Sequence, residues 1–123
     1  MYTLDTNAII YYATGEATAL PSLIPIIQSE MVLIVPAIVV TELWSSKHTS
    51  SAEMRIIENL LHTMLVVSFD EVLAKNAGIL RREYNLSLGD SLIAATTLAT
   101  GTTLLTRNVK DFQHVPGLSI EAI

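Results

Sequence analysis

The stretch Met1-Tyr2-Thr3-Leu4-Asp5-Thr6-Asn7 decides the fold, because a strand gives way to a helix inside it. Tyr2–Leu4 has the composition of a short strand, and Ala8–Tyr12 that of the start of a helix. Asp5 therefore falls at the carboxyl end of a strand, and in open α/β sheets this edge is where binding sites form. Asp is also a common helix N-cap, so this residue alone does not distinguish a site from a cap.

The rest of the chain alternates between strand-like and helix-like segments. Further strands are predicted at Met31–Val35, Leu65–Ser68, Thr103–Thr106 and Leu118–Ala122. Helices are predicted at Ala17–Ser29 (kinked or broken by Pro21 and Pro25), Ala37–Lys47 (with Pro36 at its first turn), Ala52–Met64, Glu71–Tyr84 (capped by Asp70) and Gly89–Thr100 (closed by Gly101), and a turn at Val109–Phe112. This alternation predicts one α/β domain over residues 1–123, with a central parallel sheet flanked by helices on both faces.

The composition limits the class of protein. The chain has 123 residues and no cysteine, which excludes disulfides, zinc–thiolate sites and thiol catalysis. The longest apolar run, Met31–Val40, has ten residues and contains Pro36, whereas a membrane-spanning helix needs about 20. No basic-then-apolar leader opens the chain, so we expect a cytoplasmic protein without a membrane segment.

The hydrophobic content exceeds what one core requires. Half of the residues are hydrophobic, and the mean hydropathy is +0.47. We therefore expect an additional apolar face that a partner covers, as in a homodimer. The candidate surfaces are two apolar stripes at helical spacing, one within Leu20–Ile27 and one within Met54–Leu61.

Three further acids can be placed at the same sheet edge as Asp5. Glu42 lies in an otherwise almost wholly apolar helix, one turn after Ile38, and is either on a solvated stripe or over the end of the preceding strand. Asp90 has capping-box spacing from Ser87, or it faces Asp5 from the first turn of its helix.

The fourth acid, Asp111, follows the fourth strand. Asn108 and Asp111 have cap spacing, so a structural turn is one interpretation. Alternatively, Thr106 and Asn108 hydrogen-bond the carboxylates and Asp111 completes an acidic cluster. The net charge of −5, from 12 acidic and 7 basic residues, would then be largely local and could be offset by a divalent cation.

The segments that carry these acids resemble the signature of the PIN domain family, particularly the VapC-type toxins of toxin–antitoxin pairs. The resemblance covers nearly the whole chain in order. It rests on Leu4-Asp5-Thr6-Asn7, the isolated Glu42, Gly89-Asp90-Ser91-Leu92-Ile93-Ala94-Ala95 and Thr106-Arg107-Asn108-Val109-Lys110-Asp111-Phe112. Ser91 stands where Ala is commoner in the family.

The resemblance implies a ribonuclease that uses Mg²⁺ or Mn²⁺, forms a homodimer and is inhibited by a small cognate antitoxin. Carried over position by position, Asp5, Glu42, Asp90 and Asp111 would be the catalytic, metal-binding acids, supported by Thr6, Asn7, Thr106 and Asn108. Oxygen-only ligands favour such hard cations, and no nucleophilic side chain is then required.

Basic and aromatic residues near these motifs are few. Arg107 and Lys110 flank the fourth acidic motif and are candidates for binding RNA phosphates. The pair Arg81 and Arg82 is expected on a solvated helix face, and the three histidines share no ligand spacing. Trp44 is expected in the core rather than stacked on a base.

Three other functions remain open at this stage. Asp5 could be the aspartyl nucleophile of a haloacid-dehalogenase-like phosphatase, although Asn7 breaks the Asp-x-Asp pattern of that class. A receiver-like signalling domain would need an Asp at the end of the third strand, where Ser68-Phe69 stands, and a Lys after the last strand. A PIN-type module could also bind RNA without cutting it.

Overall fold

The computed structural model describes residues 1–123 and contains a single five-stranded sheet. Its strands are β1 (Tyr2–Leu4), β2 (Leu33–Pro36), β3 (Leu65–Val67), β4 (Thr103–Thr106) and β5 (Ser119–Ala122). Its helices are α1 (Thr6–Thr14), α2 (Leu20–Ile27), α3 (Ala37–Ser45), α4 (Ser51–Leu61), α5 (Glu71–Tyr84), α6 (Leu88–Thr100) and α7 (Val109–Phe112). None of these helices is long and apolar enough to cross a membrane.

The sheet is parallel throughout, with the strand order β3-β2-β1-β4-β5. The chain builds β1, β2 and β3 toward one edge and then returns to add β4 and β5 on the other side of β1. The strand order therefore reverses between β1 and β4, and the crevice at such a reversal, beyond the carboxyl ends of the strands, is the preferred site for a ligand.

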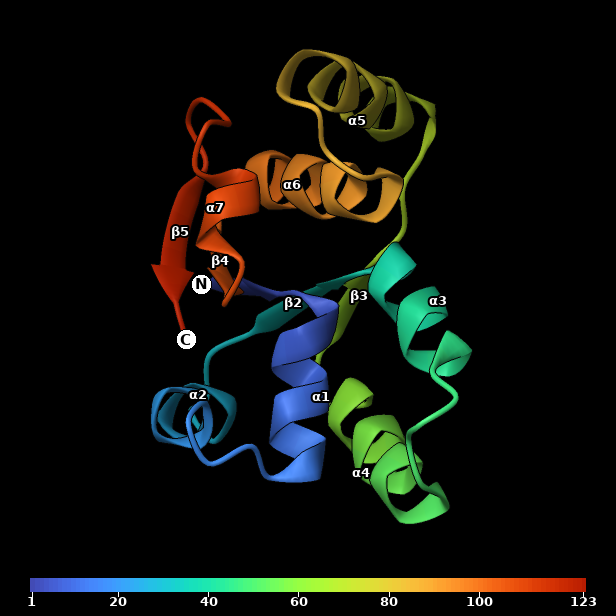
Figure 1. The fold of residues 1–123 in the computed structure, drawn as a ribbon, viewed down its shortest axis with the longest axis vertical. Helices are drawn as coiled ribbons and strands as arrows, with labels where there is room; N and C mark the ends of the chain where they lie inside the picture. Colours follow the sequence, from blue (N-terminus) through green and yellow to red (C-terminus); the bar gives the residue numbers. More distant parts are fainter.

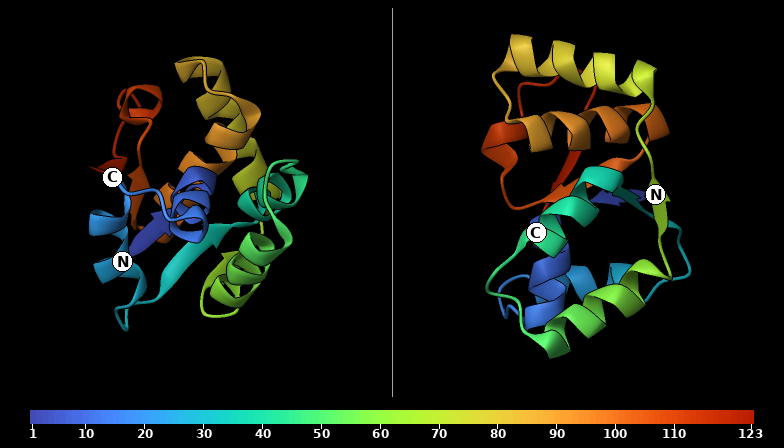
Figure 2. Two further views of the ribbon diagram at one scale, coloured as in Figure 1. Left: turned by 60° about the horizontal axis from the view of Figure 1, so that its bottom comes forward. Right: turned by 90° about the vertical axis from the view of Figure 1, so that its right-hand side faces the viewer.

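Helices cover both faces of the sheet, as the sequence predicts. Figure 1 shows α5 and α6 on one side of the strands and α1, α2 and α4 on the other, and the side view in Figure 2 shows the same three layers. Helix α3 contacts both α1 and α6, so it joins the two helical layers. The main core includes Leu4, Val35 and Leu105 from the central strands, all fully buried.

The predicted strands and helices are confirmed in order and type, with differences at their ends. Pro36 is the last residue of β2 and the N-cap of α3, because its backbone is still extended (φ −60°, ψ 141°). The segment predicted as a kinked or broken helix contains one helix, α2, in which Pro21 lies in the first turn and Pro25 lies inside. The predicted turn at residues 109–112 is the short helix α7.

The two apolar stripes do not form the free surface expected of them. Leu23 of α2 and Ile57 of α4 are fully buried, and Leu60 is nearly so. These helices turn their stripes toward α1 and the sheet, and only Ile24 and Ile56 in these helices are large and exposed. The expectation that Trp44 lies in the core is also wrong, since its exposed fraction is 49%.

A buried hydrogen bond between threonines connects β1 to the residue before β4. The hydroxyl oxygens of Thr3 and Thr102 are 2.6 Å apart, and Thr102 has a second partner in Thr100 at 3.0 Å. Thr3 is fully buried and has no other side-chain hydrogen bond. Thr3 therefore depends on Thr102 for its only side-chain hydrogen bond, whereas Thr102 has a second partner.

We expect Thr102→Val to destabilise the protein more than Thr3→Val. Thr102→Val leaves the buried Thr3 hydroxyl without a partner, which costs about 1–3 kcal/mol, whereas Thr3→Val leaves Thr102 bonded to Thr100. Urea unfolding of the two variants measures the difference. Equal losses, or a larger loss for Thr3→Val, would contradict this assignment of partners.

Candidate active site

Asp5 follows β1 directly and lies at the centre of the carboxyl edge of the sheet. It is the N-cap of α1, where its Oδ1 accepts a hydrogen bond of 2.8 Å from the Ala8 amide. Its exposed fraction is only 5%. The cap interpretation and the site interpretation are therefore compatible, because capping occupies Oδ1 and leaves the second carboxylate oxygen available.

Burial is the main cause that raises the pKa of Asp5. Hydrogen bonds from the Thr106 side chain and the Ala8 amide act in the opposite direction, and the negative charges of Asp90 and Glu42 raise the pKa further. Asp5 is thus a desolvated acid surrounded by other acids. A cation that approaches such a carboxylate stabilises its charged form.

Glu42 is held against the start of α1. The Thr6 hydroxyl donates a 2.8 Å hydrogen bond to its Oε1. On the other side, a Cβ added to Gly89 would lie 3.2 Å from Oε2, closer than most real Cβ contacts. Helix α6 therefore approaches the Glu42 carboxylate because residue 89 has no side chain. The hydrogen bond from Thr6 explains how an exposed acid keeps a defined position.

Asp90 lies in the first turn of α6 and is half-buried. Its amide donates to Ser87 Oγ at 3.1 Å, which is one half of the predicted capping box. The other half, a hydrogen bond from the Ser87 amide to the Asp90 carboxylate, is not formed. Burial is the largest cause that raises the pKa of Asp90, the Ser87 side chain lowers it, and the charges of Asp111 and Glu42 raise it.

These side chains surround a small hollow of about 110 Å³ at the strand reversal between β1 and β4. The residues around it come from the ends of β1 and β4 and from α1, α3 and α6. They are Asp5, Thr6, Asn7, Glu42, Asp90, Ile93 and Asn108. Thr106 is fully buried at the end of β4 and accepts a hydrogen bond of 3.0 Å from the Asn108 amide.

Asp111 lies next to this hollow rather than in it. It is exposed on α7, and it lines a second hollow of about 300 Å³ together with Asp90 and Lys110. Three of the four predicted acids therefore line one hollow, and Asp90 lines the second hollow together with the fourth. Lys110 is brought to the site, in the second hollow.

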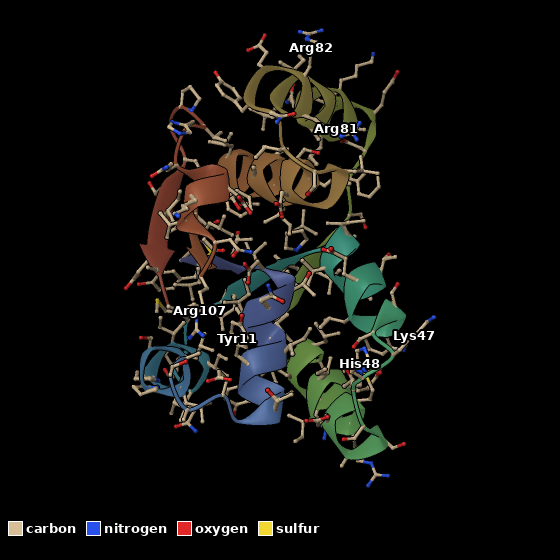
Figure 3. The ribbon with its side chains drawn as sticks, in the orientation of Figure 1. Tyr11, Lys47, His48, Arg81, Arg82 and Arg107 are labelled. Atoms are coloured by element: carbon tan, nitrogen blue, oxygen red, sulfur yellow. The ribbon has the colours of Figure 1, made fainter.

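Arg107 is not brought to the acids. Its guanidinium lies over the Tyr11 ring, 4.6 Å from the centroid, and its Nε donates to the Ile123 carbonyl at 3.3 Å. Figure 3 shows Arg107 beside Tyr11 on the side of the molecule where α2 lies. The side chain therefore ties the end of the chain to α1, and the structure does not place it where it could hold a phosphate beside the acids.

The negative charge of the cluster is not compensated by the protein. The three ion pairs of the structure are exposed, and none involves Asp5, Glu42, Asp90 or Asp111. No three carboxylates or imidazoles lie close enough together to form a ready-made metal site. An all-oxygen donor set that lacks a cationic partner nevertheless matches the chemistry that Mg²⁺ and Mn²⁺ require.

Two neighbours of the acids were missed by sequence reasoning. Gly89 contacts Glu42, and a helix-disfavouring residue in a first turn, just before an acid, is the signal that could have identified it. His114 lines the second hollow with Asp90 and Lys110. His114 lies four residues after Lys110 and beyond the end of α7, and this spacing matches no known site motif.

Comparisons with known proteins agree with this geometry. The PIN domain family model matches residues 2–118. The chain is 26% identical to Ribonuclease VapC2 of Rickettsia felis, over 98% of this chain and 96% of that protein.

Solved structures resemble the chain over nearly its whole length. The VapBC2 complex of Rickettsia felis bound to a promoter DNA fragment has a TM-score of 0.79 at 24% identity, over 99% of this chain and 98% of that one. A toxin–antitoxin complex from Klebsiella pneumoniae has a TM-score of 0.79 at 28% identity, over 96% and 95% of the two chains. With the family model covering almost every element of the fold, this chain belongs to the PIN domain family.

Proposed function

We propose that this protein is an endoribonuclease that depends on Mg²⁺ or Mn²⁺ and acts as the toxin of a toxin–antitoxin pair. The observation that carries the proposal is the buried, uncompensated acid Asp5, which meets Glu42 and Asp90 at the strand reversal of a PIN domain. The similarity to a protein named Ribonuclease VapC2 supports RNA as the substrate.

The chain's own residues would hold the cation and position the substrate. Asp5, Glu42 and Asp90 supply carboxylate oxygens, while Thr6 orients Glu42 and Thr106 orients Asp5. Asp111 would act across Asp90 from the second hollow. When bound, a divalent cation supplies an activated water and stabilises the leaving oxygen of the phosphodiester.

The proposed partners are an antitoxin protein and a second copy of the chain. The similar structures include a VapBC complex and a toxin–antitoxin complex, which supports an antitoxin. Large exposed apolar side chains on α3, α5 and α6 would be the contact residues, since the predicted stripes on α2 and α4 are mostly buried. Trp44, Val72, Ile79 and Leu88 are the most exposed candidates there.

Cleavage tests the catalytic assignment. We expect purified protein with Mn²⁺ or Mg²⁺ to cut RNA and to stop when EDTA is added. Asp5→Asn and Asp90→Asn should each lower kcat/KM by more than roughly 100-fold. A loss of up to that size is typical when the substituted residue only hydrogen-bonds a metal ligand. Asp70→Asn is the matched control, because Asp70 is an exposed N-cap of α5 and Asn caps about as well. Cutting that survives both site substitutions would rule out the assignment.

Thermal melts test the cluster as a cation site. With raised folded-state pKa values, Asp5 and Asp90 bind protons more tightly in the folded protein than in the unfolded chain. The free energy of unfolding of the metal-free protein should therefore rise as the pH falls from neutral toward about 4, and this gain is lost as the pH rises through the raised pKa values.

The variant Asp90→Asn should weaken these responses. At neutral pH in EDTA it should melt higher than wild type, because one repulsive charge is gone. It should gain less from acidification and less from Mn²⁺, which stabilises wild type by about 2.7 kcal/mol at a hundredfold excess over Kd. Asp70→Asn should keep both wild-type responses. Identical Mn²⁺ shifts in Asp90→Asn and wild type would place the cation elsewhere.

Gly89→Ala tests the position of Glu42 without changing any charge. The new Cβ would press on the Glu42 carboxylate, so we expect a smaller rise in Tm on adding Mn²⁺. Gly78→Ala, inside α5, is the control, since its Cβ would meet nothing within 4 Å. That variant should gain up to about 1 kcal/mol from helix propensity and keep the full Mn²⁺ shift. A full shift in Gly89→Ala would show that the close approach of residue 89 to the Glu42 carboxylate does not affect cation binding.

A further inference from the structure

Three hollows follow one another across the surface, beginning at the acidic one. The acidic hollow and the second hollow share Asp90. The second hollow and a third, of about 460 Å³, share Asn85 and Leu86. Asn85 is the C-cap of α5, and Leu86 and Ser87 lead directly into α6. The three hollows therefore connect the carboxyl edge of the sheet to the corner between α5 and α6.

Basic side chains line the second and third hollows of this series but not the acidic one. Lys110 and His114 line the second, and Arg81 and Arg82 line the third. The acidic hollow and the two remaining hollows of the molecule contain no basic residue. Three of the seven Lys and Arg residues of the chain line these two hollows, with Asp90 and Asp111 also lining the second.

We propose that these three hollows form one path for a single strand of RNA, which leaves the acidic hollow over Asp90 and runs past Lys110 and His114 to Arg81 and Arg82. The proposal rests on the proposed ribonuclease function and adds the direction of the substrate. Phosphates of the strand would contact the basic groups of the second and third hollows, since no basic residue lines the acidic hollow itself.

The shape of the path favours a single strand over a duplex. Asn85, the one non-glycine residue with a left-handed backbone (φ 54°), turns the chain from α5 into α6 and lines both the second and the third hollow, so a strand that follows them would pass this corner. A flexible strand can follow such a corner, whereas a duplex is stiff over this distance. The half-buried ring of Tyr84 lines the second hollow, where a base could stack on it.

The basic residues outside the path provide a matched control. Lys47 follows α3 and Arg55 lies on α4; both are exposed, and neither lines a hollow. Figure 3 places Arg81 and Arg82 on α5 and Lys47 on the side of the molecule formed by α3 and α4. Arg81→Gln/Arg82→Gln and Lys47→Gln/Arg55→Gln therefore remove the same charge from different places.

The test is the salt dependence of RNA binding. Fluorescence anisotropy of a labelled oligouridylate of about 16 nucleotides is measured in EDTA over a range of salt concentrations. For Arg81→Gln/Arg82→Gln we expect weaker binding and a slope of log K against log [salt] that is shallower by about 1.4, because each phosphate contact on a single strand contributes about 0.7. Lys47→Gln/Arg55→Gln should keep the wild-type slope. With Mn²⁺, the first pair should raise KM for RNA cleavage rather than lower kcat.

Equal effects of the two double variants would overturn the path. A duplex RNA of the same length that competes as well as the single strand would overturn the single-strand assignment. Failure of the nuclease proposal is separately visible, because wild type would then bind the oligouridylate with the expected difference between variants and cut no RNA with any divalent cation.

Discussion

The burial of the Asp5 carboxylate at the end of the central strand is the constraint on which the site depends. A nearly buried acid is costly unless something compensates its charge, and here its neighbours are Glu42 and Asp90 rather than basic residues. The parallel sheet creates this arrangement, since it brings the ends of β1 and β4 and the first turns of α1 and α6 to one edge. The fold thus maintains a charge imbalance that a bound cation would relieve.

Helix capping and site chemistry use the same residues without conflict. Asp5 caps α1 through one oxygen, and Asp90 lies in a first turn whose cap is Ser87. The positive ends of α1 and α6 therefore point toward the acids, which partly offsets their repulsion before any cation binds. The local roles that seemed to compete with a functional interpretation are what fix these carboxylates in place.

The distribution of charge would separate the proposed cation site from most of the proposed RNA contacts. The acids that would hold a cation occupy the innermost hollow, and the basic residues begin only one hollow further out. A basic side chain among the acids would pair with them and reduce their affinity for a cation. Arg107, one of the two basic residues within the fourth motif, is instead held by Tyr11 and the chain terminus. This separation explains how a protein with a net negative charge can act on a polyanion.

The sequence by itself determined the order of strands and helices, several helix ends and the edge at which the acids gather. These features follow from short-range rules: Asp70 caps α5 and Gly101 closes α6 because of local hydrogen bonds and backbone preferences. Only the tertiary structure decided where the long side chains go. Trp44 is exposed, the stripes of α2 and α4 face inward, and Glu42 meets Gly89, because each outcome depends on which distant helix packs alongside. Periodicity gives a helix its faces, but contacts between elements far apart in the chain decide which face is covered.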